Sequence, residues 1–179
     1  MKNVLLLGDS IRLSYQPLVK EKLKGKANVY GPEENGRWAG YTLNSLRFWL
    51  PMMPDPDIIH INNGLWDLGD DYGFGRNFSL PVEYESALER LAVVLKRTGA
   101  TVVFATTTPT KLGKDLSDII TFNDILKYVA ARDGLEINDL FEVINADIDG
   151  NLGPDNLHLS PAGVEIAASK VAEVLGKYL

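Results

Sequence analysis

The sequence predicts an α/β protein in which a parallel sheet carries helices on both faces. Short apolar runs alternate with segments of helical periodicity along the whole chain, which is the pattern of repeated strand–helix units. The apolar runs are continuous, as expected of strands buried on both faces. All 179 residues are expected to form one domain, since no linker, repeat or low-complexity segment interrupts the pattern.

Five short apolar runs are the expected strands, each bounded by turn residues. They are Val4–Leu7, Ala27–Tyr30, Asp57–Ile61, Thr101–Ala105 and Leu135–Asn138.

Five longer segments have the spacing of helices, and glycine or proline residues mark several of their ends. They are Ser14–Lys24, Tyr41–Leu50, Pro81–Arg97, a helix from Ser117 or Asp118 to Arg132, and Pro161–Leu175. Ligands of open parallel sheets bind beyond the carboxyl ends of the strands. Functional residues are therefore expected in Gly8–Ser10, Gly31–Gly40, Asn62–Asp67 and Thr106–Pro109.

Composition excludes several classes of function. A net charge of −6 and a pI near 4.9 argue against nucleic acid and anionic membranes as partners. The absence of cysteine excludes disulfides, thiol catalysis and cysteine metal sites. The first apolar run is too short for a signal peptide, and no run is long enough to cross a bilayer, so a cytoplasmic protein is expected.

Gly8-Asp9-Ser10 ends the first expected strand and places a serine at the edge of the sheet. A serine in such a turn exposes its hydroxyl, and its backbone N–H is able to bind an oxyanion. The same tripeptide is also common as a simple helix cap beside a turn glycine. On its own it is a weak indication of catalysis.

The segment from Asp155 to His158 lies just before the last helix and offers a base for this serine. A serine hydroxyl is a poor nucleophile without a base, and the base needs an orienting group. The chain has two histidines, and the other, His60, is expected to lie in the third strand, bonded to backbone and out of reach. An Asx turn leading into the Ser160-capped helix would explain the same residues without catalysis.

Two further segments follow the second and third strands: Asn35 to Gly40 and Asn62 to Asp67. A glycine N–H in the first segment and an asparagine amide in the second are able to stabilise an oxyanion. Turn formation alone also favours Asn and Gly at such places.

Together these four blocks resemble the SGNH hydrolases, also called GDSL-type esterases. The resemblance covers the whole chain and implies a flavodoxin-like three-layer αβα sandwich with strand order 2-1-3-4-5. It implies ester hydrolysis through an acyl-serine intermediate, with Ser10 as nucleophile, His158 as base and Asp155 as the acidic residue. It implies no metal and no cofactor.

The resemblance also implies an oxyanion hole, which includes the Ser10 N–H. In the second block this role falls on Gly40, with Gly36 as the alternative. The third block departs from the family pattern because Trp66 occupies the position of the usual asparagine, and an indole is not expected to replace an amide. The chain looks like a subgroup with Asn-x-Gly-Leu-Trp-Asp, which assigns the role to Asn62, with Asn63 as the alternative.

The substrate is expected to be a short acyl ester, most simply an acetyl ester, with a carbohydrate as a plausible alcohol. The residues expected to line the site are Asp9, Arg37, Trp38, Trp66 and Asp67, with Tyr72, Phe74 and Arg76 as further loop residues. The competing hypotheses are a non-catalytic ligand-binding module on the same scaffold and a flavodoxin-like nucleotide binder. The second is disfavoured because the first turn lacks a phosphate-binding glycine run. The oligomeric state is left open.

Overall fold

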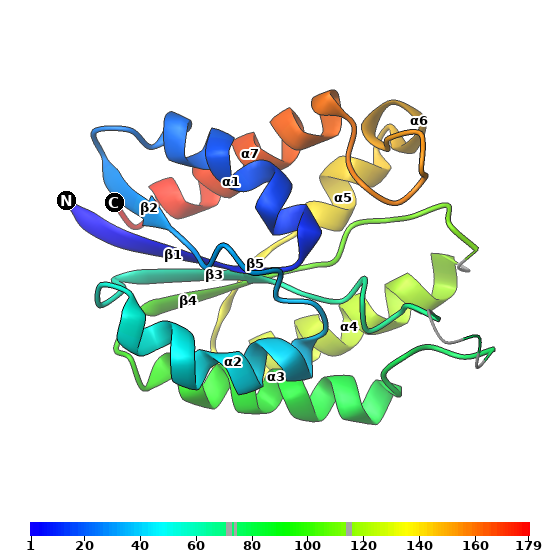
Figure 1. Cartoon of the computed structure of the whole chain (residues 1–179), viewed down its shortest axis with the longest axis horizontal. Helices are drawn as coiled ribbons and strands as arrows, with labels where there is room; N and C mark the ends of the chain where they lie inside the picture. Colours follow the sequence, from blue (N-terminus) through cyan, green and yellow to red (C-terminus); the bar gives the residue numbers. More distant parts are fainter. Residues whose placement is uncertain (71–72, 74, 114–115) are drawn as a thin grey trace.

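The computed structural model describes residues 1–70, 73, 75–113 and 116–179 and contains one parallel sheet. Its five strands have the order β2-β1-β3-β4-β5, which confirms the predicted order (Figure 1). The strands are β1 (Lys2–Gly8), β2 (Ala27–Tyr30), β3 (Ile58–Asn62), β4 (Thr101–Ala105) and β5 (Glu136–Asn138).

The carboxyl ends of four strands lie at one level. Gly8 of β1 pairs with Asn62 of β3, Asn62 pairs with Ala105 of β4, and Ala105 pairs with Asn138 of β5. The loops that follow these residues therefore leave the sheet along one edge, where ligands of such folds bind.

Two layers of helices cover the sheet (Figure 1). One layer contains α2 (Ala39–Met52), α3 (Pro81–Lys96) and α4 (Leu116–Asp133). The other contains α1 (Ser10–Lys22), α5 (Leu140–Asn145), α6 (Ile148–Asn151) and α7 (Pro161–Gly176).

The alternation of side chains along each strand produces two cores. Leu5, Leu7 and Ile59 pack against the layer of α2, α3 and α4. Val4 and Leu6 point to the opposite face and pack against the layer of α1, α5 and α7. This explains why the strands appear in the sequence as continuous apolar runs.

Helix α1 begins at Ser10, four residues earlier than the sequence pattern indicated. The Asp9 carboxylate accepts a hydrogen bond of 2.9 Å from the Ile11 N–H and caps the helix. An aspartate at this position satisfies one of the unpaired N–H groups of the first turn. The early start places the serine directly on the helix N-terminus.

Two short helices, α5 and α6, were not expected from the sequence. They contain six and four residues and are capped by Asp139 and Asp147. Segments of this length are too short to show a helical period. No helix of the described part of the chain is both long and apolar enough to span a membrane.

Candidate active site

Ser10 is held at the junction of β1 and α1 by a turn that requires glycine. Gly8 has a φ of 141°, and a Cβ at this residue would lie 2.2 Å from the Asn62 carbonyl oxygen. The close approach of β1 and β3 therefore excludes any side chain at Gly8. The Ser10 backbone N–H lies at the N-terminus of α1, where the helix dipole favours negative charge.

The loop that carries His158 is a tight turn closed by backbone contacts. Leu152 and Leu159 form an antiparallel bridge, and the Gly153 N–H donates to the His158 carbonyl at 2.7 Å. Within the turn, the Oδ1 of Asp155 accepts from the N–H groups of Leu157 (3.0 Å) and His158 (2.9 Å). The Asx turn expected here is present, and it orients the histidine.

The β4–α4 loop supports this turn from the side. The Thr110 hydroxyl donates to the Asn156 carbonyl at 2.7 Å, and the Lys111 N–H donates to the same oxygen at 2.9 Å. Asn156 has a positive φ of 59°, which asparagine tolerates better than most residues. Residues far apart in the sequence thus fix the position of the imidazole.

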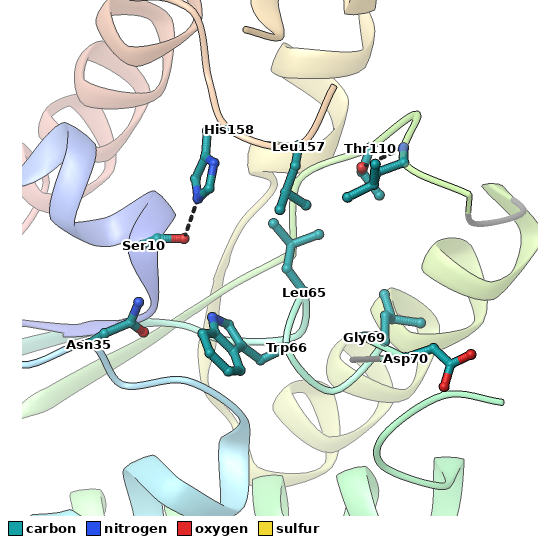
Figure 2. A pocket seen from close by; sticks show the side chains of 11 residues that line it. Ser10, Asn35, Leu65, Trp66, Gly69, Asp70, Thr110, Leu157 and His158 are labelled. Carbon is teal, nitrogen blue, oxygen red and sulfur yellow. Dashed lines mark hydrogen bonds between the residues drawn. The ribbon is translucent and has the colours of Figure 1, made fainter. Parts of the chain in front are cut away.

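Ser10, His158 and Asp155 form a continuous hydrogen-bonded chain. The Nε2 of His158 lies 3.0 Å from the Ser10 Oγ, and its Nδ1 lies 2.6 Å from the Asp155 Oδ2. Figure 2 shows the histidine ring above the serine hydroxyl, with the Nε2 directed at it. The three residues expected to act together are therefore in contact, although they come from opposite ends of the chain.

The Asp155 carboxyl is held in its ionised form. The hydrogen bond to His158, followed by the two backbone N–H donors, lowers the pKa of Asp155 to about 2. An ionised carboxylate at the Nδ1 favours the tautomer whose Nε2 is able to accept a proton from Ser10.

A pocket of about 330 Å³ opens beside the serine hydroxyl. Four leucines make much of its wall apolar, and the serine, histidine, an asparagine and a tryptophan are among the polar groups it contains. The lining residues are Ser10, Asn35, Leu65, Trp66, Leu68, Gly69, Asp70, Thr110, Leu112, Leu157 and His158.

The expected glycine donors are not among the residues that line this pocket. Gly40 lies in the first turn of α2, beside the Trp38 ring, and lines other surface hollows. The Gly36 N–H donates to the Gly8 carbonyl at 2.9 Å. The Gly36 N–H is therefore already bonded, and Gly40 does not line the pocket beside Ser10.

The expected asparagine donors are also directed elsewhere. The Asn62 side chain is buried, and its Nδ2 donates to the Thr106 carbonyl at 3.1 Å. The Asn63 Nδ2 donates to the Arg37 carbonyl (2.8 Å) and to the Thr42 hydroxyl (3.2 Å), which uses both of its hydrogens. Neither side chain lines the pocket at Ser10.

Of the described residues that were expected to contact substrate, Trp66 alone lines the pocket. Asp9 is buried as a helix cap, and Asp67 is buried where it accepts from the Ala39 N–H (3.0 Å) and the Ser79 hydroxyl (2.7 Å). Arg37 lies over the Tyr41 ring and is exposed.

The remaining aromatic and charged residues that were expected to line the site also lie outside the described pocket wall or outside the described residues. Trp38 packs against Tyr41 and Phe78, and the exposed Arg76 is not part of the pocket wall. Tyr72 and Phe74 lie outside the described residues. An aromatic platform of several side chains is therefore not present among the described pocket residues.

Two residues of the site were not singled out by the sequence: Asn35, which lines the pocket at Ser10, and Arg12, which holds the loop that carries Asn35. Arg12 is fully buried and donates to the carbonyls of Pro32 (2.8 Å), Glu34 (2.8 Å) and Gly8 (3.3 Å). A basic residue two positions after Ser10 resembles an ordinary solvated helix residue, so the sequence gives little indication of this role.

His60 is fully buried in β3 and does not line the pocket beside Ser10. Its ring contacts side chains rather than backbone: the Tyr15 hydroxyl at 3.4 Å and the Asn138 Nδ2 at 3.0 Å. Burial lowers the pKa of His60 to about 3, so the ring is neutral. The described residues contain no cluster of His, Asp and Glu that would hold a metal ion.

Several solved structures that share this fold are described as esterases, acylhydrolases or hydrolases. An acetyl xylan esterase superposes with a TM-score of 0.83 at 18% identity over 97% of this chain and 99% of that one. A lipase/acylhydrolase from Enterococcus faecalis superposes with a TM-score of 0.83 at 20% identity over 100% and 97%. A protein from Slackia heliotrinireducens, described provisionally as an SGNH hydrolase, gives 0.74 at 21% over 98% and 99%.

The chain therefore has the three-layer fold of the solved SGNH and GDSL-type hydrolases over its whole length. At these identities the likeness establishes the fold, and the activities of those proteins remain their own. A scan against models of protein families finds no match, and a search of curated protein sequences finds none.

Proposed function

We propose that the chain is a serine esterase that hydrolyses short-chain acyl esters, with acetyl esters as the favoured substrates, through an acyl-serine intermediate. The observation that carries this proposal is the hydrogen-bonded chain from Ser10 through His158 to Asp155 at the mouth of an apolar pocket. A serine, a base and an orienting carboxylate in this geometry are the parts of a nucleophilic triad, whatever the fold that holds them.

The reaction begins when the Ser10 Oγ attacks the ester carbonyl carbon and the His158 Nε2 takes the hydroxyl proton. The carbonyl electron pair moves to oxygen and forms a tetrahedral oxyanion. When the oxyanion collapses, the bond to the alcohol oxygen breaks, and His158 returns its proton to the leaving alcohol. Water then attacks the acyl-serine by the same sequence and releases the carboxylic acid and the free hydroxyl.

The pocket supports a short acyl group. Its volume of about 330 Å³ lies at the small end of ligand-binding cavities. Leu65, Leu112 and Leu157 provide an apolar wall for an acyl chain. A larger fatty acyl chain would extend beyond the pocket into solvent.

We propose a carbohydrate as the alcohol part of the ester. Fewer aromatic residues support this than the sequence indicated. Trp66 offers an aromatic face at the pocket, and one solved protein with this fold is an acetyl xylan esterase. Membership of the subgroup with Asn-x-Gly-Leu-Trp-Asp is likewise part of the proposal.

The test is the rate of p-nitrophenyl acetate hydrolysis by the wild type, Ser10→Ala and Ser14→Ala. Ser14 is a matched control because it lies on the same helix and donates to the Ile11 carbonyl at 2.7 Å, away from the pocket. The proposal predicts a loss of about 1,000-fold or more in Ser10→Ala and near wild-type turnover in Ser14→Ala. An inactive wild type, or activity that survives in Ser10→Ala, would leave the binding-module hypothesis in its place.

A further inference from the structure

Two side-chain N–H groups beside Ser10 have no assigned role. One belongs to Asn35, whose Oδ1 accepts from the Arg37 N–H at 2.8 Å, so its Nδ2 is turned to the other side. The other belongs to the indole of Trp66. Within the described part of the chain, no acceptor bonds either N–H group, and both residues line the pocket that contains the Ser10 hydroxyl.

The side-chain nitrogens of Asn35 and Trp66 face the same region beside Ser10. Figure 2 shows the amide nitrogen of Asn35 and the indole nitrogen of Trp66 both turned toward the Ser10 hydroxyl, from the side opposite His158. An acyl carbon bonded to the Ser10 Oγ would place its oxygen in the space that these donors face. The backbone N–H of Ser10 lies at the N-terminus of α1, next in the chain to the hydroxyl that would carry the acyl group.

We propose that Asn35 Nδ2–H and Trp66 Nε1–H, with the Ser10 backbone N–H, form the oxyanion hole of this site. The assignment rests on the proposed esterase function and replaces the donors expected from the sequence. Those donors are either bonded to protein groups, as in Gly36 and Asn63, or outside the pocket, as in Gly40 and Asn62.

Trp66 meets the chemical requirement even though an indole has no amide carbonyl. An oxyanion accepts hydrogen bonds only, so its partner needs a donor and has no use for an acceptor. The indole N–H is a donor without acceptor capacity. A donor fixed in place before the reaction stabilises the developing charge with little reorganisation.

Contacts of the neighbouring residues restrict where both donors lie. Gly64, with a φ of 140°, starts the turn that carries Trp66, and a Cβ there would lie 2.8 Å from the Thr107 Cβ. Leu65, directly before Trp66 in the sequence, and Leu68, two residues after it, are both buried. On the other side of the site, Arg12 fixes the carbonyls of Pro32 and Glu34, directly before Asn35.

The test uses two conservative substitutions. Trp66→Phe removes the N–H and retains an aromatic ring. Asn35→Asp removes the N–H donors and retains the oxygen that accepts from Arg37. We expect each to lower kcat for p-nitrophenyl acetate by about 100-fold, with KM changed by less than about threefold. Trp38→Phe is the control, because this tryptophan lies outside the pocket and should leave kcat within about twofold of the wild type.

Three outcomes separate the alternatives. If Trp66 served only as a stacking surface, Trp66→Phe would keep its kcat. If Asn35 served only the turn, Asn35→Asp would restore what Asn35→Ala loses. Either result would overturn the assignment of that residue while Ser10→Ala remained inactive, so the proposed function would stand. Activity that survived in Ser10→Ala would instead remove the proposed function itself.

Discussion

Asp155 uses its two carboxylate oxygens for different tasks. The Oδ1 closes the turn by accepting from two backbone N–H groups, and the Oδ2 bonds the His158 Nδ1 at 2.6 Å. The sequence indicated both an Asx turn and a triad acid here, and the geometry accommodates both at one residue.

Asp155→Asn separates these tasks. The asparagine oxygen still closes the turn, but its NH₂ group faces the Nδ1 and forces the tautomer whose Nε2 carries the hydrogen. His158 then cannot take the Ser10 proton, so we expect kcat to fall by about 1,000-fold or more. Steady-state kinetics, with circular dichroism to verify the fold, measure the effect. Turnover within tenfold of the wild type, roughly, would show that the carboxylate does not set the tautomer.

Two buried carboxyls, Asp9 and Asp67, determine part of the pH dependence of stability. Burial is the main cause that raises the pKa of each to about 7. In the unfolded chain an aspartate titrates near its ordinary pKa of about 3.9. Between these values the folded state holds protons that the unfolded state has lost, so these two groups lower stability as pH rises from about 4 to about 7.

The variants Asp9→Asn and Asp67→Asn keep an oxygen acceptor for Ile11 and Ala39 and remove the titration. We expect each variant, relative to the wild type, to gain stability as pH rises from about 4 to about 7, since one pH unit in a pKa corresponds to about 1.4 kcal/mol. Urea unfolding at several pH values measures this difference. The variants must be compared with the wild type because His60 also titrates. Its lowered pKa makes the folded protein more stable as pH rises over part of this range, which opposes the effect of the two aspartates. Parallel curves for variants and wild type would contradict the raised pKa values.

At the scale of elements, the loop between β2 and α2 depends on a single buried cation. Arg12 donates to three backbone carbonyls and to the Gln16 side chain at 3.0 Å. Carbonyls that lose such a partner in a buried site cost free energy, because water does not replace it. The loop that carries Asn35 should therefore lose its position when Arg12 is replaced.

Arg12→Met keeps much of the aliphatic volume and removes the donors. We expect it to lower the free energy of unfolding by about 2–5 kcal/mol and to reduce kcat as well. Arg47→Met is the control, because Arg47 is exposed and lies over the Phe48 ring. Urea titrations of both variants give the comparison, and equal stability of the two would contradict the anchoring role.

The sequence predicted the elements with long periodic patterns and missed those decided by local capping. All five strands and the five long helices are present. The start of α1 was misplaced because its cap, Asp9, precedes Ser10 without an apolar period to mark the first turn. Helices α5 and α6 are single turns or little more, so no period is visible in them.

The hydrogen-bonded residues of the candidate site were predictable from the sequence, and the oxyanion donors that we propose beside them were not. Ser10, Asp155 and His158 stand in short motifs whose chemistry is visible in the residue types. The directions of the Asn35 and Trp66 side chains depend on contacts from distant segments, such as Arg12 with Pro32 and Glu34. Motif position alone therefore favoured Gly40 and Asn62, whose surroundings in the fold direct them elsewhere.

At the scale of the whole molecule, the strand order determines where the pocket forms. β1 lies between β2 and β3, so the chain leaves the sheet in different directions after these neighbouring strands. The pocket lies at this switch point, beyond the carboxyl ends of the strands, and four loops contribute to its wall. Its limited volume is a property of this arrangement rather than of one residue.

The limited volume predicts a preference for short acyl groups. In a series of p-nitrophenyl esters from acetyl to octanoyl, we expect kcat/KM to be highest for the shortest chains and to fall by about tenfold or more at octanoyl. Acetylated xylose oligomers extend the series to the carbohydrate alcohol. A preference for octanoyl would indicate a lipase-like site that this pocket does not explain.

The most direct test of the central claim is the detection of the acyl-enzyme. The wild-type protein is mixed with p-nitrophenyl acetate and quenched in acid, and its peptides are examined by mass spectrometry. We expect one added acetyl group on the peptide that contains Ser10 and none in Ser10→Ala. Hydrolysis without any acetylated intermediate, or an acetyl group on a residue other than Ser10 that is required for turnover, would contradict it.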